Sequence, residues 1–280
     1  MKIIYIAGTS HSGSTLLDLM LNAHSDIISG GELAMLERQL QPRPLKRKFV
    51  PCTCGARSLL ECEFWSAVSR HAEASIGKSI RQLDLKSPGD FAKHNQALYK
   101  AMADVSGSNF IVDSSKLPKR LSQLIKLDLD IYLIHLIRDP KGQIHSVQRK
   151  HGGLMRHILR YQIVHEQIKR MRKAVPDSVV HYEELVRNPE RTLTKLMHHI
   201  GLPFEARQLQ WSDAEKHHAA GNHMRFKTSN ELRLDESWRR GLKPRHRIIV
   251  NMGSRALAPV IGLGLGLLPR TVGLHPSIDI

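Results

Sequence analysis

The segment Gly8–Thr15, with the sequence GTSHSGST, follows the apolar run Ile3–Ala7 and opens the amphipathic run Ser14–Asn22. Its spacing, G-x-x-x-x-G-x-[ST], is that of a phosphate-binding loop between a buried strand and a helix. The glycines let the backbone wrap so that successive N–H groups point inward, and the helix N-terminus adds a positive dipole. This loop therefore predicts an α/β fold that binds a phosphate group at the end of its first strand.

The rest of the chain alternates apolar, β-branched runs with helical patterns, as in a parallel sheet sandwiched by helices. The expected strands are Ile3–Ala7, Phe110–Val112, Ile131–Ile137 and Ser178–His181. The expected helices are Ser14–Asn22, Pro118–Leu127, Lys141–Lys150, Leu154–Ala174 and Pro189–Ile200. A stretch from about 38 to 70 breaks the pattern with prolines and all three cysteines. We interpret it as an insertion at the open end of the sheet, within a single domain spanning 1–280.

Positive charge dominates the composition, with 42 Lys and Arg against 26 Asp and Glu, a net +16. Such a surplus predicts an anionic partner. Basic clusters at Arg43–Lys48, Lys169–Lys173 and Arg239–Arg247 favour a polyanionic acceptor or peripheral contact with an anionic membrane surface. Aromatic residues make up only 5% of the chain, which supplies few surfaces for stacking on bases, so we expect no specific nucleic acid.

The loop differs from that of nucleotide hydrolases at one position. Ser14 stands where those proteins have the lysine that reaches the β- and γ-phosphates. A triphosphate with magnesium is therefore a poor fit, whereas a phosphate or a phosphosulfate fits.

A second anion site is indicated by Arg138, at the carboxyl end of the strand Ile131–Ile137. Ligands of doubly wound folds bind at the carboxyl ends of strands. Ser146 lies two helical turns further on, and an arginine with a hydroxyl can hold one phosphate. The alternative interpretation is a surface ion pair between Arg138 and Asp139.

Together these residues resemble the sulfotransferases that use 3′-phosphoadenosine 5′-phosphosulfate (PAPS). Gly8–Thr15 looks like their 5′-phosphosulfate loop, and Arg138 with Ser146 looks like their 3′-phosphate motif. Four further stretches are similar to segments of bacterial members: Val112–Pro118, Tyr182 with Leu185 before Asn188-Pro189, Gly221–Arg225 and Asp235–Arg239.

The resemblance implies a P-loop-type α/β sandwich that transfers a sulfuryl group from PAPS to a hydroxyl of a carbohydrate or another small-molecule acceptor, without a metal. It also implies that the 221–239 region closes over the adenosine and the 3′-phosphate. The residues that it implies for PAPS binding are His11, Ser12, Gly13, Ser14, Thr15, Arg138, Ser146, Tyr182, Asn222 and Arg225.

Glu32 follows a double glycine in the segment Ser29–Leu33. This segment resembles the glycine-glutamate element of tyrosylprotein and related bacterial sulfotransferases, which implies that Glu32 is the general base. Two alternatives stay open. Glu32 can cap the helix that follows, or the base can be Glu37 or Asp113.

His11 departs from the family, in which its position is usually an arginine or a lysine that neutralises the leaving group. A histidine neutralises charge only when protonated, and donates a single hydrogen bond when neutral. Lys116 is similar in place to a lysine that contacts the sulfonate, and it can carry that charge alone. The other interpretation makes His11 the base, as a histidine is in cytosolic sulfotransferases.

Cys52, Cys54 and Cys62 resemble a cysteine-bearing insertion of some bacterial sulfotransferases. Three thiolates with a histidine such as His71 can hold zinc, but a C-x-C pair with a third cysteine eight residues later is not a standard finger spacing. We therefore expect packing or a local disulfide, and no metal.

The cysteines are also too few and too local for a disulfide scaffold, and the N-terminal apolar run is too short for a signal peptide, which favours the cytoplasm. The uncharged stretch Ala256–Leu268 is shorter than the roughly 20 residues that span a bilayer. We expect it to form a packed C-terminal element, with a membrane-surface anchor as the alternative.

Two other functions account for part of these features. A P-loop small-molecule kinase would share the loop, but it should carry the loop lysine and bind ATP with magnesium. A basic nucleic-acid-binding protein would account for the net charge, and its affinity should fall steeply with salt and not depend on PAPS.

Overall fold

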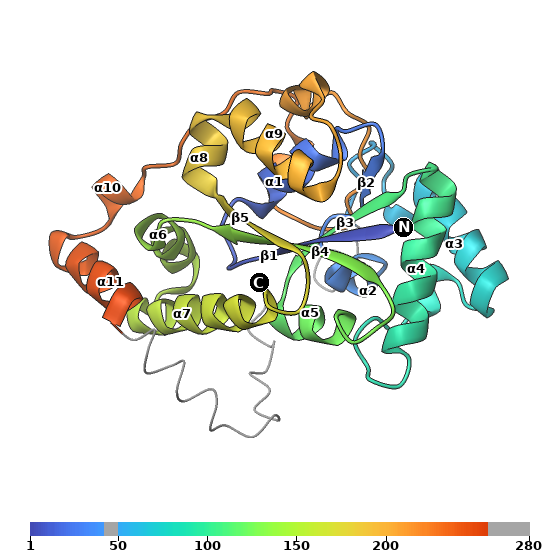
Figure 1. The fold of residues 1–280 in the computed structure, drawn as a ribbon, viewed down its shortest axis with the longest axis horizontal. Coiled ribbons are helices and arrows are strands. Elements are labelled where there is room, and N and C mark those ends of the chain that lie inside the picture. The colour runs from blue at the N-terminus through green and yellow to red at the C-terminus, as the bar shows by residue number, and fades with distance from the viewer. Residues whose placement is uncertain (42–49, 257–280) are drawn as a thin grey trace.

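The computed structural model describes residues 1–41 and 50–256. Within them the chain forms a five-stranded parallel sheet in the order β2-β3-β1-β4-β5 (Figure 1). The strands are β1 (Lys2–Ala7), β2 (Ile27–Ser29), β3 (Phe110–Lys116), β4 (Asp130–Ile137) and β5 (Asp177–His181). The four predicted strands are confirmed, and β3 runs on to Lys116, beyond its predicted end.

Helices cover both faces of the sheet, because β1 alternates its side chains between two cores. Ile4 and Ile6 pack in one core with α1 (Ser14–Asn22), α8 (Tyr182–Arg187) and α9 (Pro189–Ile200). Ile3 and Tyr5 pack in the other core, against α3 (Glu63–Ile76), α4 (Phe91–Ser106), α5 (Pro118–Leu124) and α7 (Leu154–Met171) (Figure 1). This alternation is what a strand buried on both faces requires.

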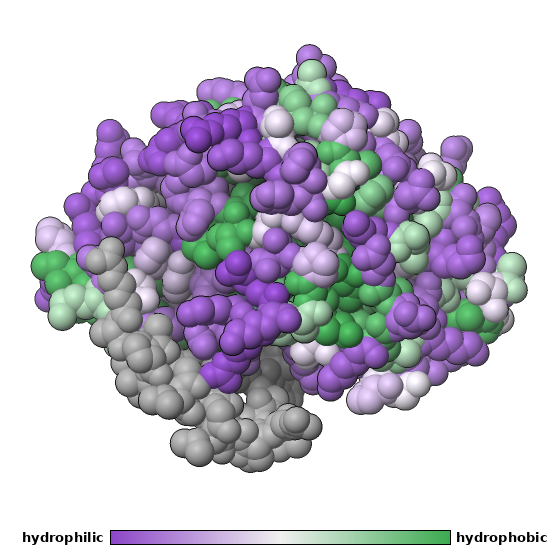
Figure 2. All heavy atoms as spheres, in the orientation of Figure 1, coloured by the Kyte–Doolittle hydropathy of each residue, from purple (hydrophilic) through white to green (hydrophobic). Residues whose placement is uncertain are grey.

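The remaining elements are shorter or lie at the edges of the sandwich. The helices are α2 (Leu36–Gln39), α6 (Pro140–His151), α10 (Trp238–Gly241) and α11 (Pro244–Ala256). The 3₁₀ turns are Leu33–Met35, Leu59–Glu61, Ile80–Gln82, Ala206–Gln210 and His223–Phe226. Figure 2 shows that the surface on this side is mostly hydrophilic, as the charged composition requires.

The chain leaves neighbouring strands in opposite directions at the centre of the sheet. From β1 it passes through α1 to β2 at one edge, and from β4 it passes through α6 and α7 to β5 at the other edge. The carboxyl ends of β1 and β4 therefore flank a topological switch point, where open α/β sheets bind their ligands.

The predicted insertion at about 38 to 70 is only partly irregular. Residues 42–49 lie outside the described residues, but Glu63 already begins α3, and Phe64 and Trp65 are buried in the core. The analysis of the sequence did not predict α3 or α4, which pack against each other. The five helices that it did predict are confirmed, α1 and α9 with the predicted bounds and α5, α6 and α7 with ends shifted by one to three residues.

No helix in residues 1–41 or 50–256 is long and apolar enough to cross a bilayer. The packed C-terminal element predicted at Ala256–Leu268 lies outside the described residues, except for Ala256, the last residue of α11.

Candidate active site

Two glycines of the loop between β1 and α1 lie against neighbouring elements. A Cβ on Gly8 would lie 2.7 Å from the carbonyl oxygen of Leu136 in β4. Gly13 has a φ of 94°, and a Cβ there would lie 2.3 Å from Cδ2 of Tyr182. Since no larger residue fits at either position without a shift, glycine is what allows the loop to lie against β4 and α8.

Donors from the β4 side hold the loop by its carbonyl groups. Arg138 Nη1 donates to the His11 carbonyl at 2.9 Å, and Gln143 Nε2 donates to the Ser10 carbonyl at 2.8 Å. In a trans peptide the next N–H points the opposite way, so the amides of His11 and Ser12 point away from these donors. His11 itself has a φ of 64°, the left-handed conformation that helps successive amides form an anion-binding nest.

The loop also contains two hydroxyl groups whose hydrogen-bonding capacity is unused. Thr9 Oγ1 and Ser12 Oγ are buried and have no hydrogen-bond partner among the residues that the structure describes. A buried hydroxyl without a partner is costly and usually marks a ligand or a bound water. Together with the helix N-terminus at Ser14, these groups fit an anion that accepts several hydrogen bonds.

Lys116 lies at the end of β3, where the register pairs it with Ala7 just before the loop. It has a φ of 67°, which is uncommon for a residue with a side chain and is often found at functional sites. Its Nζ forms an ion pair with Glu32 Oε1, and the two side chains are 12% and 23% exposed. The pair is therefore shielded, yet both groups keep access to the surface.

The backbone around Glu32 is held from two sides. Ser114 N donates to the Gly31 carbonyl at 3.0 Å, and Ala219 N donates to the Gly30 carbonyl at 2.8 Å. The N–H of Glu32 donates to the Ala220 carbonyl at 3.4 Å. Glu32 precedes the turn Leu33–Met35, but its side chain makes no cap hydrogen bond there, so the capping alternative is wrong.

The other two candidate bases are engaged elsewhere. The Glu37 carboxylate accepts from Leu85 N at 2.7 Å. Asp113 is completely buried, and Arg120 contacts it at 3.0 Å. Both carboxylates are thus held by structural contacts.

Arg138 is buried beside the loop and held by two further contacts. Its guanidinium carbon lies 4.6 Å from the centre of the Tyr182 ring, and Nη2 lies 2.9 Å from Asp235 Oδ2. The alternative ion pair with Asp139 is wrong, because the Asp139 side chain accepts from the N–H of Lys141 and caps α6.

Ser146, predicted to act with Arg138, lies close to the loop. Its Oγ lies 3.0 Å from His11 Nδ1. Since His11 also accepts from Arg138 through its carbonyl group, the predicted 3′-phosphate pair and the loop histidine form one hydrogen-bonded unit.

The segment Gly221–Arg225 lies over the first turn of α1. The N–H of Asn222 donates to Thr15 Oγ1 at 3.1 Å, and Arg225 Nη1 donates to the Gly221 carbonyl. The Asn222 amide oxygen accepts from Met224 N at 3.0 Å, so it stabilises the turn that carries Arg225. The predicted PAPS-binding residues from three distant parts of the sequence thus lie around one loop.

A model of the sulfotransferase family matches residues 4–206, which is most of the chain. The chain belongs to the sulfotransferase family.

This sulfotransferase is similar to two curated proteins that are each named for protein tyrosine. The protein-tyrosine sulfotransferase of Drosophila melanogaster is 24% identical over 233 residues, which cover 78% of this chain and 40% of the relative. Protein-tyrosine sulfotransferase 1 of Danio rerio is 25% identical over 232 residues, which cover 78% of this chain and 56% of the relative. The chain thus spans about half the length of the curated relatives that it matches.

Two solved structures share its fold. The sulfotransferase domain from the Synechococcus PCC 7002 olefin synthase has a TM-score of 0.60 at 20% identity, covering 92% of this chain and 94% of that one. The sulfotransferase domain from the curacin biosynthetic pathway has a TM-score of 0.51 at 19% identity, with coverages of 90% and 96%. The predicted P-loop-type sandwich is therefore confirmed.

Several residues that shape the site of this sulfotransferase were not identified from the sequence. Asp235 contacts Arg138, and Gln143 contacts the loop. Trp238 packs against Gly142, where an added Cβ would also lie 3.2 Å from Arg138 Nε. Asp235 and Trp238 belong to a segment that resembles family members, but no local pattern pairs an aspartate with an arginine 97 positions away.

One of the predicted basic clusters reaches this site. The Arg239 and Arg247 guanidinium carbons lie 4.8 and 6.0 Å from the centre of the Trp238 ring. Lys169–Lys173 instead lies at the end of α7, and Arg43–Lys48 lies outside the described residues. The positive charge at the site thus comes partly from α10 and α11.

Proposed function

We propose that this sulfotransferase moves the sulfuryl group of PAPS directly to a hydroxyl of its acceptor. The observation that carries the proposal is the meeting of the Gly8–Thr15 loop, Lys116 and Arg138 at the ends of β1, β3 and β4. An anion-binding loop, a cation with a carboxylate partner and a buried arginine are the groups that a phosphosulfate donor with a second phosphate needs.

The loop suits the 5′-phosphosulfate of PAPS. Backbone amides at the start of α1 bind its oxygens, and the hydroxyls of Thr9 and Ser12 can donate to it. Arg138 binds the 3′-phosphate, with Tyr182 against the arginine and Ser146 in contact with the loop beside it, and Asn222 and Arg225 lie over the first turn of α1. A serine in place of the loop lysine disfavours the kinase alternative, which depends on contacts to a γ-phosphate.

Glu32 is the general base in this proposal. Its carboxylate takes the proton of the acceptor hydroxyl as the acceptor oxygen bonds to sulfur. The bond between sulfur and the bridging oxygen breaks, and adenosine 3′,5′-bisphosphate leaves with that electron pair. Lys116 orients Glu32 through their ion pair and, with His11, offsets the charge on the leaving oxygen. None of these steps uses a metal.

The acceptor is a hydroxyl compound, which we propose to be a carbohydrate or another small molecule. The net charge of +16 favours an acceptor that is anionic. A tyrosine hydroxyl of a protein is the second candidate, because the curated relatives are named protein-tyrosine sulfotransferases. The cytoplasm is our proposed compartment, since three cysteines in one short stretch do not make a disulfide scaffold.

Ligand-induced stabilisation tests the donor. Adenosine 3′,5′-bisphosphate should raise the melting temperature far more than 5′-AMP or ATP with magnesium, because it fills both anion sites; a ligand at 100 times its Kd stabilises by about 2.7 kcal/mol. Equal stabilisation by 5′-AMP would remove Arg138 from the 3′-phosphate role, and preference for ATP with magnesium would favour a kinase. Labelled PAPS with panels of glycans, small hydroxyl compounds and tyrosine peptides then identifies the acceptor.

A further inference from the structure

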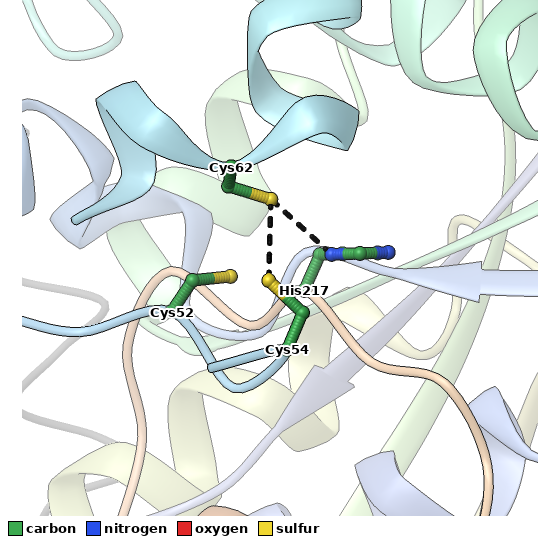
Figure 3. Close-up of side chains that lie close together, drawn as sticks. All are labelled: Cys52, Cys54, Cys62 and His217. Carbon is green, nitrogen blue, oxygen red and sulfur yellow. Dashed lines mark hydrogen bonds between the residues drawn. The ribbon is translucent and has the colours of Figure 1, made fainter. Parts of the chain in front are cut away.

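Three cysteines and a histidine, none of them in the Gly8–Thr15 loop, lie close together. The Sγ atoms of Cys52, Cys54 and Cys62 and a ring nitrogen of His217 all lie within 4.8 Å of one another (Figure 3). His217 comes from a segment 155 positions after Cys62. His71, the partner suggested by the sequence, instead lies 4.0 Å from Asp104.

Two distances within this cluster are close to those of a tetrahedral metal site. Zinc bonds of about 2.3 Å to sulfur and about 2.0–2.1 Å to nitrogen, at tetrahedral angles, place two sulfurs about 3.8 Å apart and a sulfur and a nitrogen about 3.6 Å apart. The Cys54 and Cys62 sulfurs lie 3.6 Å apart, and Cys62 Sγ lies 3.3 Å from His217 Nδ1. Small shifts of these side chains would thus place all four atoms around one ion.

We propose that Cys52, Cys54, Cys62 and His217 bind one zinc ion in a closed structural site. Three sulfurs and one imidazole are a donor set that zinc commonly takes, and four protein ligands leave no open position for a substrate. A disulfide would use only two of the three thiols and would leave the imidazole without a function. This proposal replaces the expectation of no metal, which rested on the cysteine spacing alone.

The imidazole of His217 is oriented as a zinc ligand requires. Its Nε2 lies 3.1 Å from Glu215 Oε1, so a hydrogen bond to this carboxylate leaves the lone pair of Nδ1 facing the thiols. Carboxylates hold many zinc-binding histidines in this way. The ring also stacks on Phe64 at 4.7 Å and 9°, and Trp65 Nε1 donates to the His217 carbonyl at 2.7 Å.

The cysteines lie on two local structures, a turn and the start of a helix. Cys52 and Cys54 lie on one tight turn, in which Gly55 N donates to the Cys52 carbonyl at 3.1 Å and Gly55 has a φ of 96°. Cys62 is the N-cap of α3, where the helix dipole favours a thiolate. Cys52 and Cys62 are buried, whereas Cys54 is exposed.

The site joins the cysteine turn to the segment that supports Glu32. Thr53 Oγ1 donates to the Lys216 carbonyl and accepts from His218 N at 3.0 Å. Two residues further on, Ala220 accepts from the N–H of Glu32. We therefore expect the metal to stabilise the backbone on one side of the active site without taking part in the reaction.

Elemental analysis of the full chain, purified without chelator or metal-affinity resin, tests the proposal. We expect about one zinc per chain, and well under one would overturn the proposal. Cys54→Ser is the most informative variant, because it replaces an exposed thiol and opens no buried cavity. It should retain little zinc, while the matched control His71→Gln should retain the full amount. Full zinc in Cys54→Ser would overturn the assigned ligands.

Two further measurements do not depend on any variant. Cobalt(II) loaded in place of zinc should give the intense visible bands of tetrahedral cobalt and a thiolate-to-metal charge-transfer band; a weak octahedral spectrum would contradict the site. Thiol counting on protein that is denatured without reductant, in the presence of a chelator, should find all three cysteines free. A count of one would identify a disulfide and overturn the proposal.

The outer carboxylate gives a graded test. Glu215→Gln should weaken zinc affinity about 10- to 100-fold in competition with a chelator, as removal of such partners does. Because the Glu215 side chain is exposed, the variant should fold normally, so misfolding would not explain this loss. Unchanged zinc affinity would contradict the assigned role of Glu215.

Discussion

Arg138 and Asp235 form an ion pair, with 2.9 Å between Nη2 and Oδ2, that ties the end of β4 to the segment before α10. Burial alone would raise the pKa of Asp235, but hydrogen bonds from Ser237 and Arg138 lower it to about 2. The carboxylate therefore stays ionised at neutral pH. A 3′-phosphate that binds Arg138 must share this arginine with Asp235.

Replacing Arg138 should abolish the preference for a 3′-phosphate. Arg138→Ala removes a charge-assisted contact worth about 1.5–3 kcal/mol, so the affinity advantage of adenosine 3′,5′-bisphosphate over 5′-AMP should fall by about 10- to 100-fold. Asp235→Asn removes the competing negative charge and should leave or strengthen that advantage. Isothermal titration calorimetry measures both ligands with each variant. A wild-type preference in Arg138→Ala would contradict the assignment.

Substitutions of Glu32 and His11 distinguish which of the two is the general base, because the two hypotheses predict opposite results. Glu32→Gln cannot accept a proton, so sulfuryl transfer should fall by about 10²–10⁴ while PAPS still binds. His11→Arg supplies a permanent cation and should be tolerated, or should be faster above neutral pH. Transfer rates from pH 6 to 9 at saturating PAPS test this, with the exposed Glu190→Gln as control. A nearly inactive His11→Arg with a mild Glu32→Gln would make His11 the base.

Gly31 and Gly77 have the same left-handed backbone conformation, with φ values of 72° and 71°, so each serves as a comparison for the other. An alanine at either position costs about 1–2 kcal/mol for its left-handed backbone. At Gly31 the new Cβ would also lie 2.5 Å from the Ala220 carbonyl, whereas nothing lies within 4 Å at Gly77. Denaturant unfolding should therefore show the larger loss for Gly31→Ala, and transfer should fall only in that variant because Glu32 is displaced. Equal losses with full activity would refute this role of Gly31.

His135 and His165 should make the protein less stable as the pH falls. His135 Nε2 lies 2.7 Å from His165 Nδ1. Burial, followed by the charge of His165, lowers the pKa of His135 to about 3, and burial lowers that of His165 to about 4. As the pH falls, the unfolded chain binds protons at these histidines before the folded protein does. The stability contributed by the two neutral histidines is therefore present above about pH 6.5 and is lost as the pH falls toward 4 and then 3. The loss is at most about 1.4 kcal/mol per pH unit for each histidine.

A histidine variant tests this pH dependence. His165→Gln removes one titrating group but keeps a hydrogen-bonding side chain beside His135, so the slope of the unfolding free energy between pH 5 and 6.5 should become shallower. His198→Gln, at an exposed position, should keep the wild-type slope. Urea unfolding at several pH values measures this, and an unchanged slope in His165→Gln would contradict the inference.

The amino-acid sequence by itself determined four strands of the described sheet, the helices α1, α5, α6, α7 and α9, and the edge of the sheet that carries the site. Hydrophobic periodicity and cap residues act within short windows, and parallel strands bring their carboxyl ends to one edge. Arg138 and the Gly8–Thr15 loop were therefore predictable as neighbours, whereas Lys116 was placed only by the resemblance to sulfotransferases, because the predicted strand ended at Val112.

Only the tertiary structure decided which distant side chains meet. The ion pair between Arg138 and Asp235 spans 97 positions, and the contact between Cys62 and His217 spans 155. The path of the chain after the last strand brings these residues together, and no local periodicity encodes that path. His217 joins the cysteine cluster because the 215–220 segment lies against the turn at Cys52. The spacing of the cysteines in the sequence therefore argued against a metal, whereas their arrangement in space favours one.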